Sequence, residues 1–196
     1  MLRKFIIRFL FVSLTFLIFY FLSFKFDLNP FYKVGDEIDK FNGISVFYNG
    51  GINNVEGRQV SKDGYNIGLK FQCVEFVKRY YFQVFNHKMN NSYGHAKDFF
   101  DKKIKDNQFN NDRGLKQFTN PSGSKPKIHD IVIFNNTIFN PFGHVAIISK
   151  VEENEVEIIQ QNKGSFGNSR ERLNLKYKNS IWKIDNKEIL GWLRKE

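Results

Sequence analysis

The sequence contains a single cysteine, Cys73, among its 196 residues, so no disulfide can form within the chain. This excludes a small secreted scaffold held together by disulfides. It leaves the compartment open, because many domains of the bacterial cell envelope also lack disulfides. The close spacing of His, Cys and Asp that marks a zinc site is missing too, and His87 and His95 stand apart. We therefore expect no metal and no cofactor.

Acidic residues are missing from the first 25 positions, where an uncharged and mostly apolar run extends from Phe9 to Phe24. Residues 5–24 together approach the roughly 20 residues that span a bilayer. Basic residues precede the run, and this charge pattern predicts a cytoplasmic N-terminus and an exported remainder. No small-x-small cleavage site follows it. We expect a single-pass helix in the inner (cytoplasmic) membrane with an extracytoplasmic catalytic domain; a removed signal peptide and a buried helix of the domain are the alternatives.

The formal net charge is +10, and the first 25 residues supply four of these charges. An exported basic domain favours anionic surfaces such as cell wall or lipid headgroups. A nucleic-acid partner is not expected, because the lysines are spread along the chain and not gathered into a patch with interleaved aromatic residues. A plain solvated, lysine-rich surface is the simplest interpretation.

The chain divides into three predicted parts: an anchor over residues 1–25, a connector over 26–43 and a globular domain over 44–196. Within the domain, apolar residues recur at helical spacing from Cys73, while Lys78 and Arg79 fall on the opposite side. A second helix is predicted over 96–105. Strand patterns follow over residues 128–134, 144–151, 155–162 and 189–194. Helices first and an antiparallel sheet after predict an α+β fold.

Cys73 stands at the start of its predicted helix, where unpaired backbone N–H groups and the helix dipole favour a thiolate. His144, about 70 residues downstream, offers a base. Each residue alone has a simpler explanation, since a buried cysteine often acts as a small apolar side chain and a histidine at a strand start is commonly structural. Together they indicate a Cys–His hydrolase.

The predicted hairpin of strands 144–151 and 155–162 suggests what orients His144. If residues 152–154 form a three-residue loop, Asn162 lies opposite His144 and Gln160 lies one diagonal step away. Either amide could then hold the imidazole. A two-residue loop would shift the register by one and turn both amides away.

Several motifs resemble one known family. Gln-Cys-Val-Glu-Phe at 72–76, Gly-His-Val-Ala-Ile-Ile at 143–148 and Gln-Gln-Asn at 160–162 resemble the CHAP family of cysteine- and histidine-dependent amidohydrolases/peptidases. Tyr-Asn-Gly at 48–50 and the residues ahead of the cysteine are similar to the amidase domain of glutathionylspermidine synthetase/amidase. The resemblance implies a papain-like (NlpC/P60-type) fold in which the nucleophile helix packs on an antiparallel sheet.

The same resemblance implies roles for individual residues. Cys73 matches the nucleophile and His144 the base. The family commonly has Glu where this chain has Gln160, and Asn162 follows two positions later as in the family. An amide can orient the imidazole, whereas a carboxylate would also stabilise its charged form. Gln72 is a candidate second donor to the oxyanion, although it can equally be packed away.

Three functions are compatible with these residues. The first is a membrane-anchored amidase or peptidase that cuts peptidoglycan peptides through a thioester, which the exported topology favours. The second is an amidase acting on a small amide such as a glutathionyl–polyamine conjugate, which the closest motifs favour. The third is a catalytically weak binding module, which the loss of the acidic residue at Gln160 favours. Protein partners are not indicated.

Overall fold

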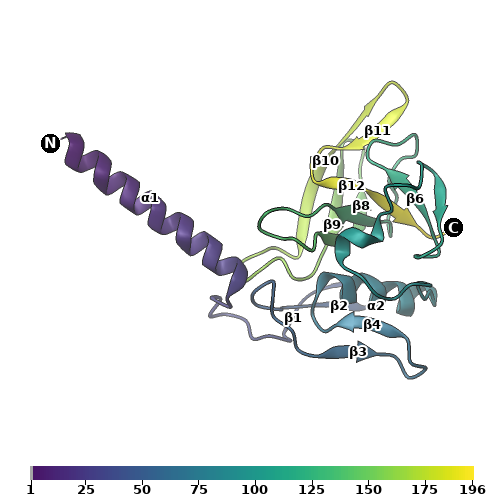
Figure 1. The fold of residues 1–196 in the computed structure, drawn as a ribbon. Helices are drawn as coiled ribbons and strands as arrows, with labels where there is room; N and C mark the ends of the chain where they lie inside the picture. The colour runs from purple at the N-terminus through teal and green to yellow at the C-terminus, as the bar shows by residue number, and fades with distance from the viewer. Residues whose placement is uncertain (1) are drawn as a thin grey trace.

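In the computed structural model, which describes residues 2–196, the chain begins with helix α1 (Leu2–Lys25), which projects away from the rest of the molecule (Figure 1). Its described apolar side chains are exposed, as Phe9 and Phe16 illustrate. The helix expected from the sequence is therefore present. The transmembrane span expected from the same residues is not found: no helix in the described part of the chain is both long and apolar enough to cross a membrane.

The domain is built around an eight-stranded sheet in the order β11-β10-β9-β8-β7-β12-β6-β5. Every neighbouring pair in it is antiparallel. The strands are β5 (Gln108–Asn110), β6 (Leu115–Thr119), β7 (Ile131–Phe134), β8 (His144–Val151), β9 (Glu155–Ile159), β10 (Arg170–Lys178), β11 (Ile181–Ile184) and β12 (Ile189–Arg194). The α+β class is confirmed.

Helix α2 (Cys73–Phe85) packs on one face of this sheet (Figure 1). Because successive strand residues point to opposite faces, Val145 and Ile147 of β8 join the core beneath α2, while Ala146 and Ile148 join a second core on the other face. Trp192 is fully buried in that second core. Burial of β8 on both faces fixes the position of His144, its first residue.

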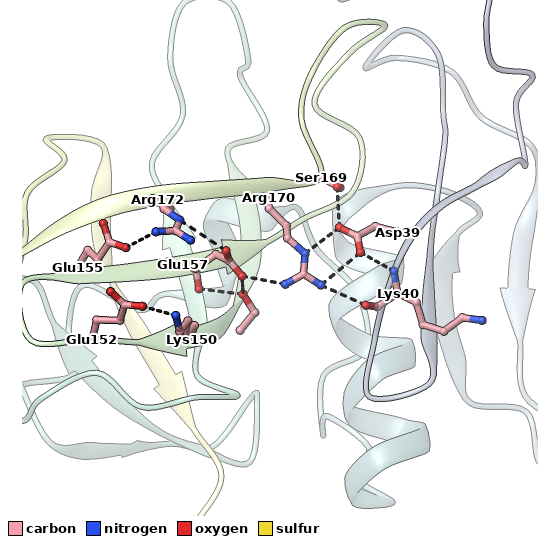
Figure 2. A network of polar contacts seen from close by, with 10 residues as sticks. Asp39, Lys40, Lys150, Glu152, Glu155, Glu157, Ser169, Arg170 and Arg172 are labelled. Atoms are coloured by element: carbon pink, nitrogen blue, oxygen red, sulfur yellow. Dashed lines mark hydrogen bonds and ion pairs between the residues drawn. The ribbon is translucent and has the colours of Figure 1, made fainter.

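The N-terminal connector is more structured than the sequence predicted. Strand β1 (Glu37–Phe41), within the predicted connector over 26–43, pairs with β2 (Ile44–Phe47) at the start of the predicted domain. Figure 2 shows how the hairpin is held: Arg170 binds Asp39 of β1 at 2.9 Å and Glu157 of β9 at 2.8 Å. A further small sheet pairs β3 (Arg58–Val60) with β4 (Asn66–Leu69).

The second helix predicted over 96–105 is wrong in length. Only a 3-10 turn, η1 (Ala96–Phe99), forms there. The Asp101 side chain accepts a hydrogen bond from the backbone N–H of Lys103 at 2.8 Å. Such a local bond offers the backbone an alternative to the helix.

The β8–β9 hairpin differs from the prediction and still brings the expected residues together. Its turn has two residues where three were predicted, because the Glu152 N–H bonds the Glu155 carbonyl and Val151 then pairs with Val156. A register shift between Ile148 and Lys150 then restores the predicted alignment, so that Ile147 pairs with Ile159. This irregularity in the ladder cancels the effect of the shorter turn.

Candidate active site

A cleft of about 890 Å³ opens where the N-terminus of α2 meets the start of β8. Cys73 and His144 both line it. The small β3–β4 sheet contributes Arg58 and Asn66, and the loop between β7 and β8 contributes Phe142. The two residues singled out by their motifs therefore share one cavity.

Cys73 is the first residue of α2, and Gln72 before it is extended and makes no side-chain cap. The first backbone N–H groups of the helix are thus left for other acceptors. The backbone N–H groups of Val145, the residue after His144, and of Val74 lie close enough to the sulfur to favour its charged form. These contacts place the thiol directly beside the start of β8.

Burial outweighs these contacts in setting the pKa of Cys73. The side chain is 7 % exposed, and desolvation raises the thiol pKa above its ordinary value although the backbone N–H groups of Val145 and Val74 lower it. The low pKa expected from a helix N-terminus is therefore wrong for this closed cleft. Cys73 is therefore a neutral thiol in the resting site.

His144 is buried and held by one amide. Its Nε2 lies 3.0 Å from Oε1 of Gln160, and because an amide oxygen only accepts, Nε2 carries the proton. Nδ1 is then the unprotonated, basic nitrogen. Burial above all, and then the charge of Lys163, lower the imidazole pKa to about 3, whereas the Gln160 bond raises it. The pair is therefore a neutral imidazole beside a neutral thiol.

The Gln160 side chain is oriented by two hydrogen bonds on the side away from His144. Its Nε2 donates to the carbonyl of Asn168 at 3.2 Å and to Oε2 of Glu171 at 3.3 Å, which turns Oε1 toward His144. Glu171 also lies 3.6 Å from the Lys163 ammonium. The sequence analysis missed Glu171 because it lies on β10, a strand that was not predicted. The site thus contains a carboxylate, that of Glu171, which contacts Gln160 and not the imidazole.

Asn162 does not contact the imidazole. Its Nδ2 donates to Oε1 of Gln72 at 2.5 Å and to the carbonyl of Ile52 at 3.0 Å. Gln72 in turn donates to the carbonyl of Asn54 at 2.6 Å. Asn162 therefore positions Gln72 and the loop at 52–54. Gln72 lines the cleft, with its amide donors directed at that loop and not at the space beside Cys73.

A buried polar network connects the start of α2 to Gln161. Arg79 Nε lies 2.5 Å from Oε1 of Glu75, and Gln161 Nε2 donates to the other oxygen at 2.9 Å. Gln161 also binds the Gln72 carbonyl at 3.1 Å. Lys78 and Arg79, which the helical pattern placed on the side opposite the core face, are both buried. The network joins the segment that carries Gln160 to the helix that carries Cys73.

A cysteine at a helix N-terminus beside a histidine on an antiparallel sheet defines the geometry of a thiol-based hydrolase site. The family model for the CHAP domain matches residues 61–162, slightly more than half of the chain. This chain belongs to the CHAP domain family, which consists generally of amidases and peptidases. The match contains Cys73, His144, Gln160 and Asn162. A comparison with curated proteins found no match.

Proposed function

We propose that this protein is a cysteine amidohydrolase or peptidase that cleaves amide bonds in peptidoglycan peptides through a thioester. The observation that carries the proposal is the placement of Cys73 and His144 in one cleft, at the N-terminus of α2 and the start of β8. The family membership supports the same reaction class.

The neutral pair sets the order of proton transfers. Nδ1 of His144 takes the thiol proton as Sγ of Cys73 attacks the carbonyl carbon of the amide. The Cys73 backbone N–H stabilises the oxyanion. The C–N bond then breaks, the imidazolium protonates the leaving amine, and an acyl thioester remains. Water attacks the thioester with Nδ1 as base, and the carboxylic acid and the free thiol are released.

The proposal includes a place at the membrane. Residues 5–24 would hold the domain at the inner membrane, with the basic N-terminus on the cytoplasmic side and the cleft facing the wall. The exposed apolar side chains along α1 support membrane contact. The nucleophile helix on an antiparallel sheet also supports a papain-like arrangement.

One observation favours a second candidate, a CHAP-fold binding module with weak catalysis. The imidazole pKa of about 3 and the raised thiol pKa keep the pair neutral, and Gln160 supplies no charge of its own to the imidazole. A wall-peptide substrate would then be bound and cut slowly.

Mass spectrometry of reaction products tests both candidates. The full chain in detergent and its Cys73→Ser variant are incubated with purified peptidoglycan and, separately, with glutathionylspermidine. New muropeptides that require Cys73 establish the wall hydrolase, and released spermidine establishes the polyamine-conjugate amidase. Retention of both proteins by peptidoglycan without any product establishes the binding module.

A further inference from the structure

One end of the cleft is basic. Arg58 of β3 and Lys78 of α2 line it on the same side as Asn66, which both residues contact. Arg58 Nη1 donates to the Asn66 side-chain oxygen at 2.8 Å, and the Lys78 ammonium binds the Asn66 carbonyl. Two cations from separate elements are thereby fixed at one end of the cavity that holds Cys73.

The charge of Lys78 is poorly neutralised. The side chain is 1 % exposed, and its direct hydrogen-bond partners are two backbone carbonyls, those of Asn66 and Ser92. Burial first, and then the charges of Arg113 and Arg58, lower its ammonium pKa to about 7, although the nearby charge of Glu75 raises it. A buried cation without a bonded carboxylate is costly, and an arriving anion would offset that cost.

The rest of the cleft offers no countercharge. Among the described residues that line it, none is Asp or Glu. The remaining wall is largely apolar or aromatic, with Val55, Tyr93 and Phe142 exposed to the cavity. A low-dielectric wall strengthens the attraction between the two cations and a negative group.

Resting on the hydrolase function proposed above, we infer that the basic end formed by Arg58 and Lys78 binds a carboxylate of the substrate, so that the enzyme prefers anionic peptide amides. Peptides with a free carboxylate on one side of the scissile bond fit this cleft. A polyamine would meet two cations at this end and no lining carboxylate. The cleft thus favours acidic wall peptides over polyamine conjugates.

Affinity labels of matched length test the charge preference. Bromoacetyl peptides of one to three alanines, ending in a carboxylate, a neutral carboxamide or a cationic aminoethylamide, alkylate Cys73 in the full chain in detergent. Intact-mass spectrometry gives the rate of labelling. For at least one length we expect the carboxylate to react about five to ten times faster than the carboxamide. The cationic label should be the slowest of the three.

The variants Arg58→Gln and Lys78→Met should bring the carboxylate-to-carboxamide ratio close to one. Lys178→Gln, which removes an exposed cation at the end of β10, should leave the ratio unchanged. Each variant is first shown by circular dichroism to be folded, because an unfolded fraction would react with all three labels at similar rates and would itself bring the ratio toward one. If Lys78→Met does not fold, Arg58→Gln decides the question.

Equal rates for the three labels at every length, or a ratio that persists in Arg58→Gln, would overturn the inference. Labelling needs no amide cleavage, so its outcome is independent of the proposed reaction. A charge preference without any hydrolysis would contradict the hydrolase function alone. Hydrolysis of wall peptides without a charge preference would contradict the anion site alone.

Discussion

Nε2 of His144 donates a hydrogen bond to Oε1 of Gln160 across 3.0 Å, and this bond leaves Nδ1 as the imidazole nitrogen that can accept a proton. Gln160 cannot present its nitrogen instead, because that nitrogen is bound to Asn168 and Glu171. The family commonly has Glu at this position, and the amide keeps the ring oriented without stabilising its charge. In the reaction that we propose, the thiol proton is therefore transferred to the imidazole during the attack.

Substituting Gln160→Glu should create the ion pair that the native site lacks. A carboxylate beside Nε2 stabilises the imidazolium and raises the pKa of His144, so thiolate forms at lower pH. The rate of Cys73 alkylation by iodoacetamide, followed against pH, measures this. We expect the native rate to climb until above pH ~9, and the variant to show a plateau near neutrality.

Gln83→Glu is the matched control, because it makes the same chemical change on the exposed face of α2. Its alkylation profile should follow that of the native protein. A Gln160→Glu profile indistinguishable from that of the control would show that Gln160 does not govern the ionisation of His144.

Asn162 and Gln160 should have separable effects. Asn162 has φ of +65°, which glycine adopts without strain, so Asn162→Gly removes the amide and keeps the backbone. Losing its bond to Gln72 loosens the residue directly before Cys73, and a small displacement of the thiol should lower turnover about tenfold. The pH profile of Cys73 alkylation should stay native. A shifted profile would mean that Asn162 acts on His144 after all.

The buried pair of Glu75 and Arg79 should be sensitive to the loss of one partner. Arg79→Met leaves the Glu75 carboxylate buried without its cation, which should cost about 3–5 kcal/mol of unfolding free energy. The double variant Glu75→Gln/Arg79→Met should recover part of that loss, because no charge stays buried. Urea unfolding followed by circular dichroism measures both, and additive losses would argue against coupling.

His144 should make the fold sensitive to acid. Its pKa is lowered to about 3 in the folded chain from an ordinary value of 6.5, so the folded state binds fewer protons than the unfolded state between these values. Stability from this group is therefore complete above pH 6.5 and is lost as the pH falls toward 3. Urea midpoints measured from pH 7 to 4 should fall less in His144→Gln than in the native chain. Identical slopes would contradict a buried, neutral imidazole.

The sequence located the starts of α2 and β8 more closely than it located the elements around them. Apolar spacing located α2 from its first residue, Cys73, because its burial against the sheet is periodic. The bounds of β8 followed from its continuous apolar run. Strand β10 was missed although Leu173, Leu175 and Tyr177 alternate along it, because its first three residues are all charged, and Glu171 was missed with it.

The burial of individual polar side chains could not be predicted from local sequence patterns. Lys78 and Arg79 follow the polar side of α2 in the helical pattern, yet the β3–β4 sheet and the 160–162 segment cover them. The same enclosure raises the thiol pKa of Cys73 where helix position alone predicts a low value. The alignment of Gln160 with His144 was predicted correctly, although through a wrong turn length that the β8 irregularity offsets.

Detection of the thioester tests the central claim most directly. The full chain is mixed with peptidoglycan peptides, quenched in acid within the first turnovers and examined by intact-mass spectrometry, with Cys73→Ser and His144→Gln beside it. We predict an added mass equal to the acyl part of the peptide, located on Cys73 and missing from both variants. Amine release by the native chain with no adduct on Cys73, or cleavage that persists in Cys73→Ser, would contradict the account.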